Sequence, residues 1–201
     1  MRANPHYFFD QNLKKGEMIA MINAFLQAIN KHVVAESTNL QATYDAKHIF
    51  NVRASADIDN GKVVNLDDMA WVDNEYFTMV QPTATSRVGL ILSVPIGADE
   101  RPKAATYEHN FYNGQGEIMR VYDLMAGDKF TVSENGITKI SSGSPAVETA
   151  LAKGQYIVAD GYDLKAQAAK PAASVGFYGE IVDVINRTNG KFYKIFVRKN
   201  G

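Results

Sequence analysis

The sequence predicts a mainly β protein, an antiparallel β-sandwich or barrel preceded by an N-terminal α-helical extension. Two observations support this class. From residue 51 onward, short apolar or alternating runs recur at intervals of roughly 8–12 residues and are separated by turn-forming pairs. Before residue 50, the stretch 17–36 contains neither Gly nor Pro. We therefore expect two segments, a helical extension or arm over 1–50 and a β-domain over 51–201.

The expected strands of the β-domain are bounded by residues that favour tight turns. The candidates cover 48–53, 62–66, 75–81, 88–94, 117–122, 129–132, 137–140, 155–159, 176–185 and 192–198. The last two are joined by Asn189-Gly190, a pair typical of hairpins. The Ala-rich stretch 166–174 is expected to be a loop.

The tripeptide Asp59-Asn60-Gly61 predicts a further hairpin within 54–68. Gly adopts positive φ without steric cost and Asn tolerates it, so this pair suits a tight turn between strands. Apolar residues flank it on both sides, with Ile58 before the turn and Val63 after it. A calcium loop is a poorer interpretation, because Gly61 stands at the fifth position, where an EF-hand requires an oxygen ligand.

The stretch 17–36 predicts an amphipathic helix. Its apolar residues fall at alternating spacings of three and four, and Phe25 widens the stripe that they form. The stripe consists of Ile19, Ile22, Leu26, Ile29 and Val33. Two interpretations stay open: the apolar face packs on the β-domain of the same chain, or it docks on a partner or a second copy.

Composition narrows the function classes. The chain has 201 residues, of which 46% are apolar and 21% charged, a globular balance, and its formal net charge of −1 removes the bulk attraction expected of a nucleic-acid binder. The absence of cysteine excludes disulfides, thiolate metal sites and cysteine nucleophiles. The stretch 18–25 is too short to span a bilayer, and the first residues lack the layout of a signal peptide. We expect a soluble, non-secreted protein without membrane or nucleic-acid partners.

No catalytic motif stands out. The four histidines lack the short spacings of metal ligands, and the chain contains no G-x-S-x-G, Walker A or G-x-G-x-x-G motif. The acidic pairs at 67–68 and 99–100 fall in expected loops, where solvation is the ordinary role. We therefore expect a protein that is not an enzyme, with no catalytic residues, no metal and no cofactor.

Aromatic residues gather in one expected loop, TYEHNFYNGQGE. Tyr107, Phe111 and Tyr112 either fold back to close one end of the barrel or form a contact surface, because aromatic side chains contribute heavily at interfaces. Stacking on a sugar or a base is a third interpretation. These three residues join Ile19, Ile22, Phe25, Leu26 and Ile29 as the candidate interface residues.

Several stretches together resemble the capsid auxiliary proteins, also called decoration or cement proteins, of tailed bacteriophages. The stretches are 58–66 (IDNGKVVNL), 75–82 (EYFTMVQP), 88–95, 109–122 (HNFYNGQGEIMRVY) and 124–132 (LMAGDKFTV). In the fourth, the pattern F-x-N-x-x-G-x-x-x-R-x-Y is carried by Phe111, Asn113, Gly116, Arg120 and Tyr122. In the fifth, L-x-x-GD-x-F-x-V is carried by Leu124, Gly127, Asp128, Phe130 and Val132.

The resemblance covers roughly 50–160 and implies a structural virion protein made in the host cytoplasm. Its implied partner is the major capsid protein, and it implies a homo-oligomer, for which a trimer is one candidate. Residues 1–50 look like an addition to the pattern. The alternative is a head-fibre or adhesin-like binding module that contacts carbohydrate or another surface partner, which exposed aromatic rings in the loop around Tyr107 and Tyr112 would favour.

Overall fold

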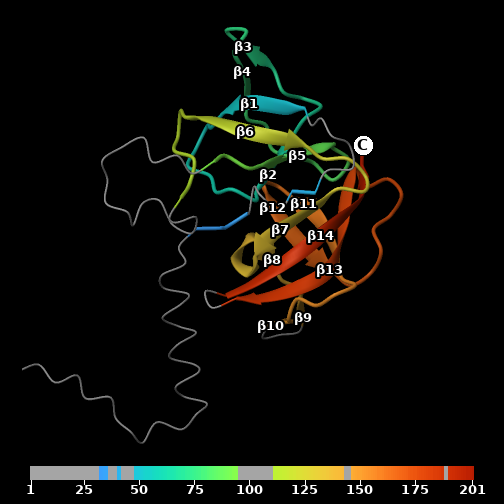
Figure 1. Cartoon of the computed structure of the whole chain (residues 1–201). Helices are drawn as coiled ribbons and strands as arrows, with labels where there is room; N and C mark the ends of the chain where they lie inside the picture. The colour runs from blue at the N-terminus through green and yellow to red at the C-terminus, as the bar shows by residue number, and fades with distance from the viewer. Residues whose placement is uncertain (1–31, 36–39, 42–47, 95–110, 143–145, 188–189) are drawn as a thin grey trace, which may run out of the picture. The chain divides into compact units, whose positions relative to one another are not determined.

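The computed structural model describes residues 32–35, 40–41, 48–94, 111–142, 146–187 and 190–201. The chain divides into two units, Met1–Lys31 and His32–Gly201, and the description below concerns the second (Figure 1). This unit is mainly β, as predicted, and the helix in its described part is the single 3-10 turn η4 (Glu134–Gly136). The residues expected to form most of the N-terminal helix, 17–31, lie outside the described residues, so the structure does not support the helical extension.

The first sheet has six strands in the order β2-β5-β6-β1-β4-β3. They are β1 (Ile49–Arg53), β2 (Val63–Asn65), β3 (Trp71–Val72), β4 (Tyr76–Thr78), β5 (Val88–Ile91) and β6 (Ile118–Asp123). All its neighbouring strands are antiparallel except β1 and β4, which are parallel. The short β3–β4 hairpin therefore forms one edge of this sheet, and it extends away from the rest of the unit in Figure 1.

The second sheet also has six strands, in the order β7-β14-β13-β11-β12-β8. They are β7 (Lys129–Ser133), β8 (Ile137–Thr138), β11 (Tyr156–Asp160), β12 (Asp163–Gln167), β13 (Phe177–Arg187) and β14 (Gly190–Asn200). A separate two-stranded ribbon consists of β9 (Ser141–Ser142) and β10 (Val147–Glu148). The predicted terminal hairpin is confirmed as β13–β14, whereas β12 was missed, because its last two residues fell in the stretch expected to be a loop.

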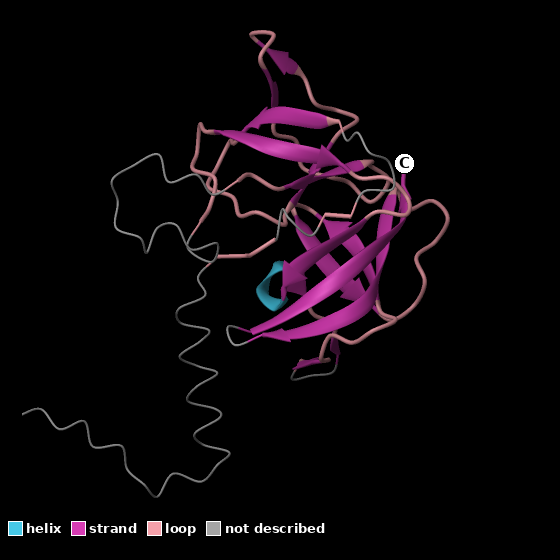
Figure 2. Cartoon of the chain, in the orientation of Figure 1, coloured by secondary structure: helices cyan, strands magenta, loops and turns pink. Residues whose placement is uncertain are grey.

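The second sheet curls into a half-barrel (Figure 2). Strands β7 and β8 are joined only by η4, yet they occupy opposite ends of the strand order, so the two edges of the sheet must approach each other. Apolar side chains of both sheets fill the interior, among them Leu90 from β5 and Phe130 and Ile195 from the half-barrel. The first sheet thus shares the core of the second, and the two sheets form one unit.

A second core lies on the other face of the first sheet. Its fully buried members include Val52, Ile91 and Met119, and Phe50 and Phe77 pack against it from the side. Strand β1 alternates accordingly, with Val52 buried and Arg53 exposed. The faces of β1 and β6 that point away from this core carry exposed side chains except at Tyr122, which packs against the core of the half-barrel.

A tight turn connects the two sheets. Gly127 has φ +102, and the buried Asp128 carboxylate accepts the backbone N–H of Met125 at 2.7 Å. Glycine is required here for the positive φ, and the carboxylate satisfies a backbone donor of the turn. The Gly-Asp pattern of the fifth stretch is therefore explained by the passage of the chain from β6 to β7.

Residues 32–35 and 40–41 lie along β7. Ala35 bridges Val132, and Gln41 and Lys129 exchange two backbone hydrogen bonds, at 2.8 and 2.9 Å. The prediction of helix up to residue 36 is therefore wrong at its end. Val33 is buried in the half-barrel core instead of continuing a helical stripe, because the free edge of β7 offers backbone partners that an extended segment can use.

The predicted hairpin over 54–68 is also wrong, although its turn exists. Gly61 has the expected positive φ of +81. The two flanks, however, do not pair with each other: Ile58 bridges Asn113, and Val63 pairs with Leu90 of β5. Asn60-Gly61 therefore turns the chain from one partner segment to another.

Candidate functional site

The tripeptide Asp59-Asn60-Gly61 is the point where several distant segments meet. Asp59 holds the beginning of the β-unit: its Oδ1 lies 2.8 Å from His32 Nδ1, and its Oδ2 accepts the backbone N–H of Val33 at 2.9 Å. Asn135 donates its amide to the carbonyl of His32 at 2.9 Å. These hydrogen bonds thus fix His32 and Val33, the first two described residues of the chain.

Asn60 lies at the centre of a buried hydrogen-bond network. Its side chain accepts the backbone N–H of Ser93 at 2.9 Å and donates to the Ser93 carbonyl at 2.8 Å. Asn113 donates to the carbonyl of Ile58 at 3.1 Å and to Asn60 Oδ1 at 3.3 Å. Three segments far apart in the sequence, those with Asn60, Ser93 and Asn113, therefore converge here.

The position of Gly61 leaves little room for a side chain. A Cβ built on it would lie 3.0 Å from both Ala35 Cβ and Val132 Cγ2. The segment around Ala35 thus packs directly on the turn. Close approach and positive φ both require glycine at this position.

The structure describes two of the eight predicted interface residues. Tyr112 is 42% exposed and stacks on the His32 ring with centroids 4.9 Å apart, while Phe111 is half-buried. Tyr112 therefore covers the His32–Asp59 pair. The other six lie outside the described residues: Ile19, Ile22, Phe25, Leu26, Ile29 and Tyr107.

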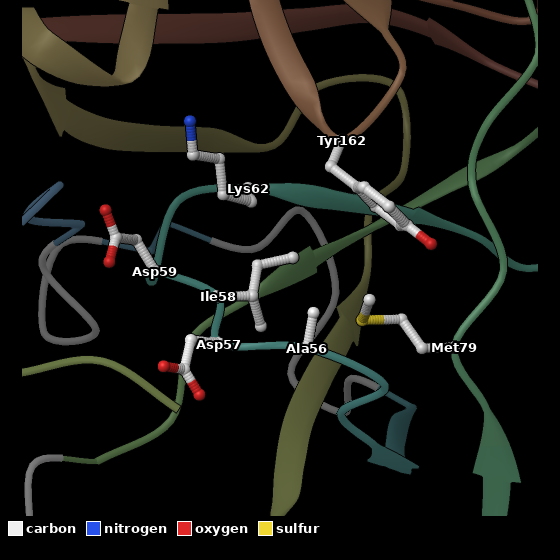
Figure 3. Close-up of a pocket in the computed structure, with 7 residues that line it drawn as sticks. All are labelled: Ala56, Asp57, Ile58, Asp59, Lys62, Met79 and Tyr162. Carbon is white, nitrogen blue, oxygen red and sulfur yellow. The ribbon is translucent and has the colours of Figure 1, made fainter. Parts of the chain in front are cut away.

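An open pocket of about 270 Å³ lies beside the tripeptide (Figure 3). Its lining consists of Ala56, Asp57, Ile58, Asp59, Lys62, Met79 and Tyr162. Met79 and Tyr162 form its apolar side, and the two carboxylates lie on the opposite side. Burial raises the pKa of the Tyr162 hydroxyl above its ordinary value, and a hydrogen bond with Ser55 partly offsets this.

The charged groups of this pocket are already engaged. Asp57 accepts the backbone N–H of Gln115 at 2.8 Å, both Asp59 oxygens bind the entering segment, and Lys62 pairs with Asp163. Such groups support the fold and show no arrangement of nucleophile and base. Within the described ranges, no cluster of three or more histidine or acidic side chains could hold a metal ion. Searched over the same ranges, the chain has no helix with the length and apolarity needed to cross a membrane.

Sequence reasoning missed an exposed aromatic row on the β3–β4 hairpin. Trp71 is 63% exposed and packs on Phe77 with ring centroids 3.9 Å apart. Phe77 makes an edge contact with Phe50, which in turn packs against His48. The lone tryptophan of the chain, next to EYF, was the signal that could have indicated this row.

The opposite face of the same sheet carries arginines between isoleucines. The register places Asn51 opposite Arg120 and Arg53 opposite Ile118, and Ile49 lies at the start of β1 on the same face. Ile49 is 43% and Ile118 48% exposed. Exposed isoleucines beside two guanidinium groups are typical of a contact surface.

A comparison of this chain with protein-family models, with curated proteins and with solved structures finds no match.

Proposed function

We propose that this chain is a non-enzymatic structural protein of a bacteriophage virion, which binds the major capsid protein and stabilises or decorates the head. The observation that carries the proposal is the resemblance of five stretches between residues 58 and 132 to capsid auxiliary proteins. These stretches have linked structural roles. Asn60, Ser93 and Asn113 share one buried network, and Asp128 shapes the turn between the sheets.

The attachment of residues 32–35 and 40–41 within the β-unit supports a tethering role for the first unit. The entering chain is held by His32 and Val33 on Asp59 and by backbone bonds of Gln41 to β7. A load applied through residues 1–31 would therefore be transmitted to the β-unit through several hydrogen bonds. We propose that the first unit contributes to attachment on the capsid or to oligomerisation.

Cementing needs little free energy from each copy. Many copies act on one shell, and bivalent or multivalent attachment raises the overall affinity far above that of a single contact. A β-unit with engaged polar groups and exposed apolar patches suits this role better than one with a reactive cleft.

Co-sedimentation tests the proposal. Mature heads lacking this chain, built from the major capsid protein encoded in the same genome, are mixed with the purified protein and pelleted. We expect saturable binding with a fixed ratio to capsid subunits, and a rise in the temperature at which the heads release DNA. No binding at micromolar concentration would overturn the proposed function.

The exposed aromatic row favours a second candidate, a head-fibre or adhesin-like module that contacts carbohydrate. Trp71 presents an exposed ring at the edge of the sheet, and such rings stack on the apolar faces of sugars. A glycan array with the wild-type chain and Trp71→Ala separates the candidates: glycan binding that depends on Trp71, without head binding, would select the adhesin.

A further inference from the structure

Two exposed surfaces at the same end of the first sheet complement each other in charge and polarity. We call the first the arginine face, which consists of Ile49, Asn51, Arg53, Ile118 and Arg120. We call the second the tryptophan hairpin, which consists of Trp71, Val72, Asp73, Asn74 and Glu75.

The arginine face has cationic groups without acidic partners. The Arg120 guanidinium makes no hydrogen bond or ion pair with any part of the chain that the structure describes. Within the described ranges, the Arg53 guanidinium has one polar partner, the Tyr76 hydroxyl, to which it donates at 3.0 Å, and it lies 5.5 Å from the centre of that ring. The exposed isoleucines Ile49 and Ile118 flank these charges.

The tryptophan hairpin has the opposite character. Trp71 is the most exposed aromatic side chain among the described residues, and Asp73 and Glu75 at the turn are both exposed. Asp73 and Asn74 have φ values of +53 and +60, so the turn is tight and holds these side chains at the tip. Among the described residues, the Glu75 carboxylate has no hydrogen-bond or ion-pair partner, and only its backbone N–H is bonded, to the Val72 carbonyl at 3.4 Å.

The Trp71 ring cannot reach the arginine face within one copy, although Asp73 at the hairpin tip accepts a 3.4 Å hydrogen bond from the Tyr76 hydroxyl that Arg53 contacts. Phe77 pairs with both Val52 and Trp71, so all three side chains share one face of the sheet, and Val52 is buried in the second core. Arg53 follows Val52 and points to the opposite face, because side chains alternate along a strand. The Trp71 side and the arginine face are therefore back to back in a single chain.

We infer that the tryptophan hairpin of one copy docks on the arginine face of a second copy. Trp71 packs against Ile49 and Ile118 of the neighbour, and the acidic tip meets Arg120. Both complementary surfaces belong to this chain, so their charge complementarity favours a second copy as the occupant. The contact is heterologous, since the two patches differ, and it produces a closed ring or an open chain of subunits. This inference is independent of the proposed function.

Charge reversal tests the contact. Sedimentation velocity of the full chain at low salt, from 1 to about 100 μM, measures self-association of the wild type, Arg120→Glu, Glu75→Arg and the double variant. We expect each single reversal to weaken association by at least about 10-fold and the double reversal to restore most of it, because paired charges across an interface set its specificity. Trp71→Ala should weaken association without rescue by either reversal.

The matched control is Lys153→Glu, a charge reversal at an exposed turn position away from both surfaces. Circular dichroism and the thermal midpoint establish that each variant folds. A monomeric wild type at all concentrations, unchanged association of both single variants, or failure of the double variant to recover would each overturn the inference. A monomeric wild type whose binding to heads depends on Arg120 would assign the arginine face to the capsid protein instead, and would also overturn it.

Discussion

The carboxylate of Asp59 lies 2.8 Å from the Nδ1 atom of His32, twenty-seven positions away in the chain. This pair joins the first described residue of the β-unit to the turn that precedes β2. The same carboxylate accepts the N–H of Val33, and Tyr112 stacks on the His32 ring. The segment that begins at His32 is therefore anchored beside the buried network of Asn60, Ser93 and Asn113.

Replacing Asp59 should loosen this anchor without unfolding the β-unit. Asp59→Ala removes the acceptor of both His32 and Val33, and we expect the free energy of unfolding to fall by about 1–3 kcal/mol. Hydrogen exchange should accelerate at 33–35 and at the facing residues of β7. The control Asp57→Ala removes a neighbouring exposed carboxylate and should leave that exchange unchanged. Equal exchange in the two variants would contradict the anchoring role.

Gly61→Val should destabilise the protein strongly. The new side chain combines strain at φ +81 with contacts of 3.0 Å to Ala35 and Val132, so the loss should exceed the roughly 1–3 kcal/mol of backbone strain alone. Gly154→Val is the matched control, because Gly154 has φ +89 but no atom within 4 Å of its Cβ position. Urea denaturation measures both variants. An equal loss in the two would show that crowding at Gly61 contributes nothing.

The Asn60 network should be a cooperative element of the fold. Asn60→Ala leaves the buried N–H and carbonyl of Ser93 without partners, which costs about 1–3 kcal/mol. Asn113→Ala should cost less when Asn60 is already absent, because the two side chains interact directly. A double-mutant cycle in urea measures this coupling, with the exposed Asn186→Ala as a control. Strict additivity would contradict a shared network.

Alkaline pH should destabilise the half-barrel through Tyr193. Burial of its ring in the core, with a smaller contribution from the Glu134 carboxylate, raises the pKa of Tyr193 from 10.0 to about 12. The unfolded chain loses this proton at lower pH than the folded chain, so the stabilisation is complete below about pH 10 and is lost as pH rises toward 12. Tyr193→Phe should flatten the fall in thermal midpoint over that window, whereas Tyr178→Phe should leave it unchanged.

The N-terminal stripe provides the last prediction. If the first unit attaches the protein to heads or to sister copies, Leu26→Asp with Ile29→Asp should abolish binding or association while the β-unit keeps its thermal midpoint. Leu26→Met with Ile29→Leu is the conservative control. Loss of the fold in the Asp variant, with a monomeric wild type, would instead assign these residues to the protein's own core.

The local sequence determined the fold class and several turns of this protein. Alternation of apolar and polar residues has the period of a strand, and Gly127 and Gly61 indicate turns, because positive φ is a property of the residue itself. The terminal hairpin followed from the same local chemistry. The sequence showed the Gly-Asp pattern. Only the fold showed that the buried Asp128 carboxylate accepts a backbone N–H in the turn between the sheets.

Only the tertiary structure decided which segments pair. The flanks of Asn60-Gly61 were expected to form a hairpin, yet Ile58 bridges Asn113 and Val63 pairs with β5. Residues near Val33 suit a helical stripe, but the free edge of β7 holds them extended. Strand partners, like the two faces that separate Trp71 from Arg120, depend on contacts between residues far apart in the chain, and local periodicity carries no information about those distances.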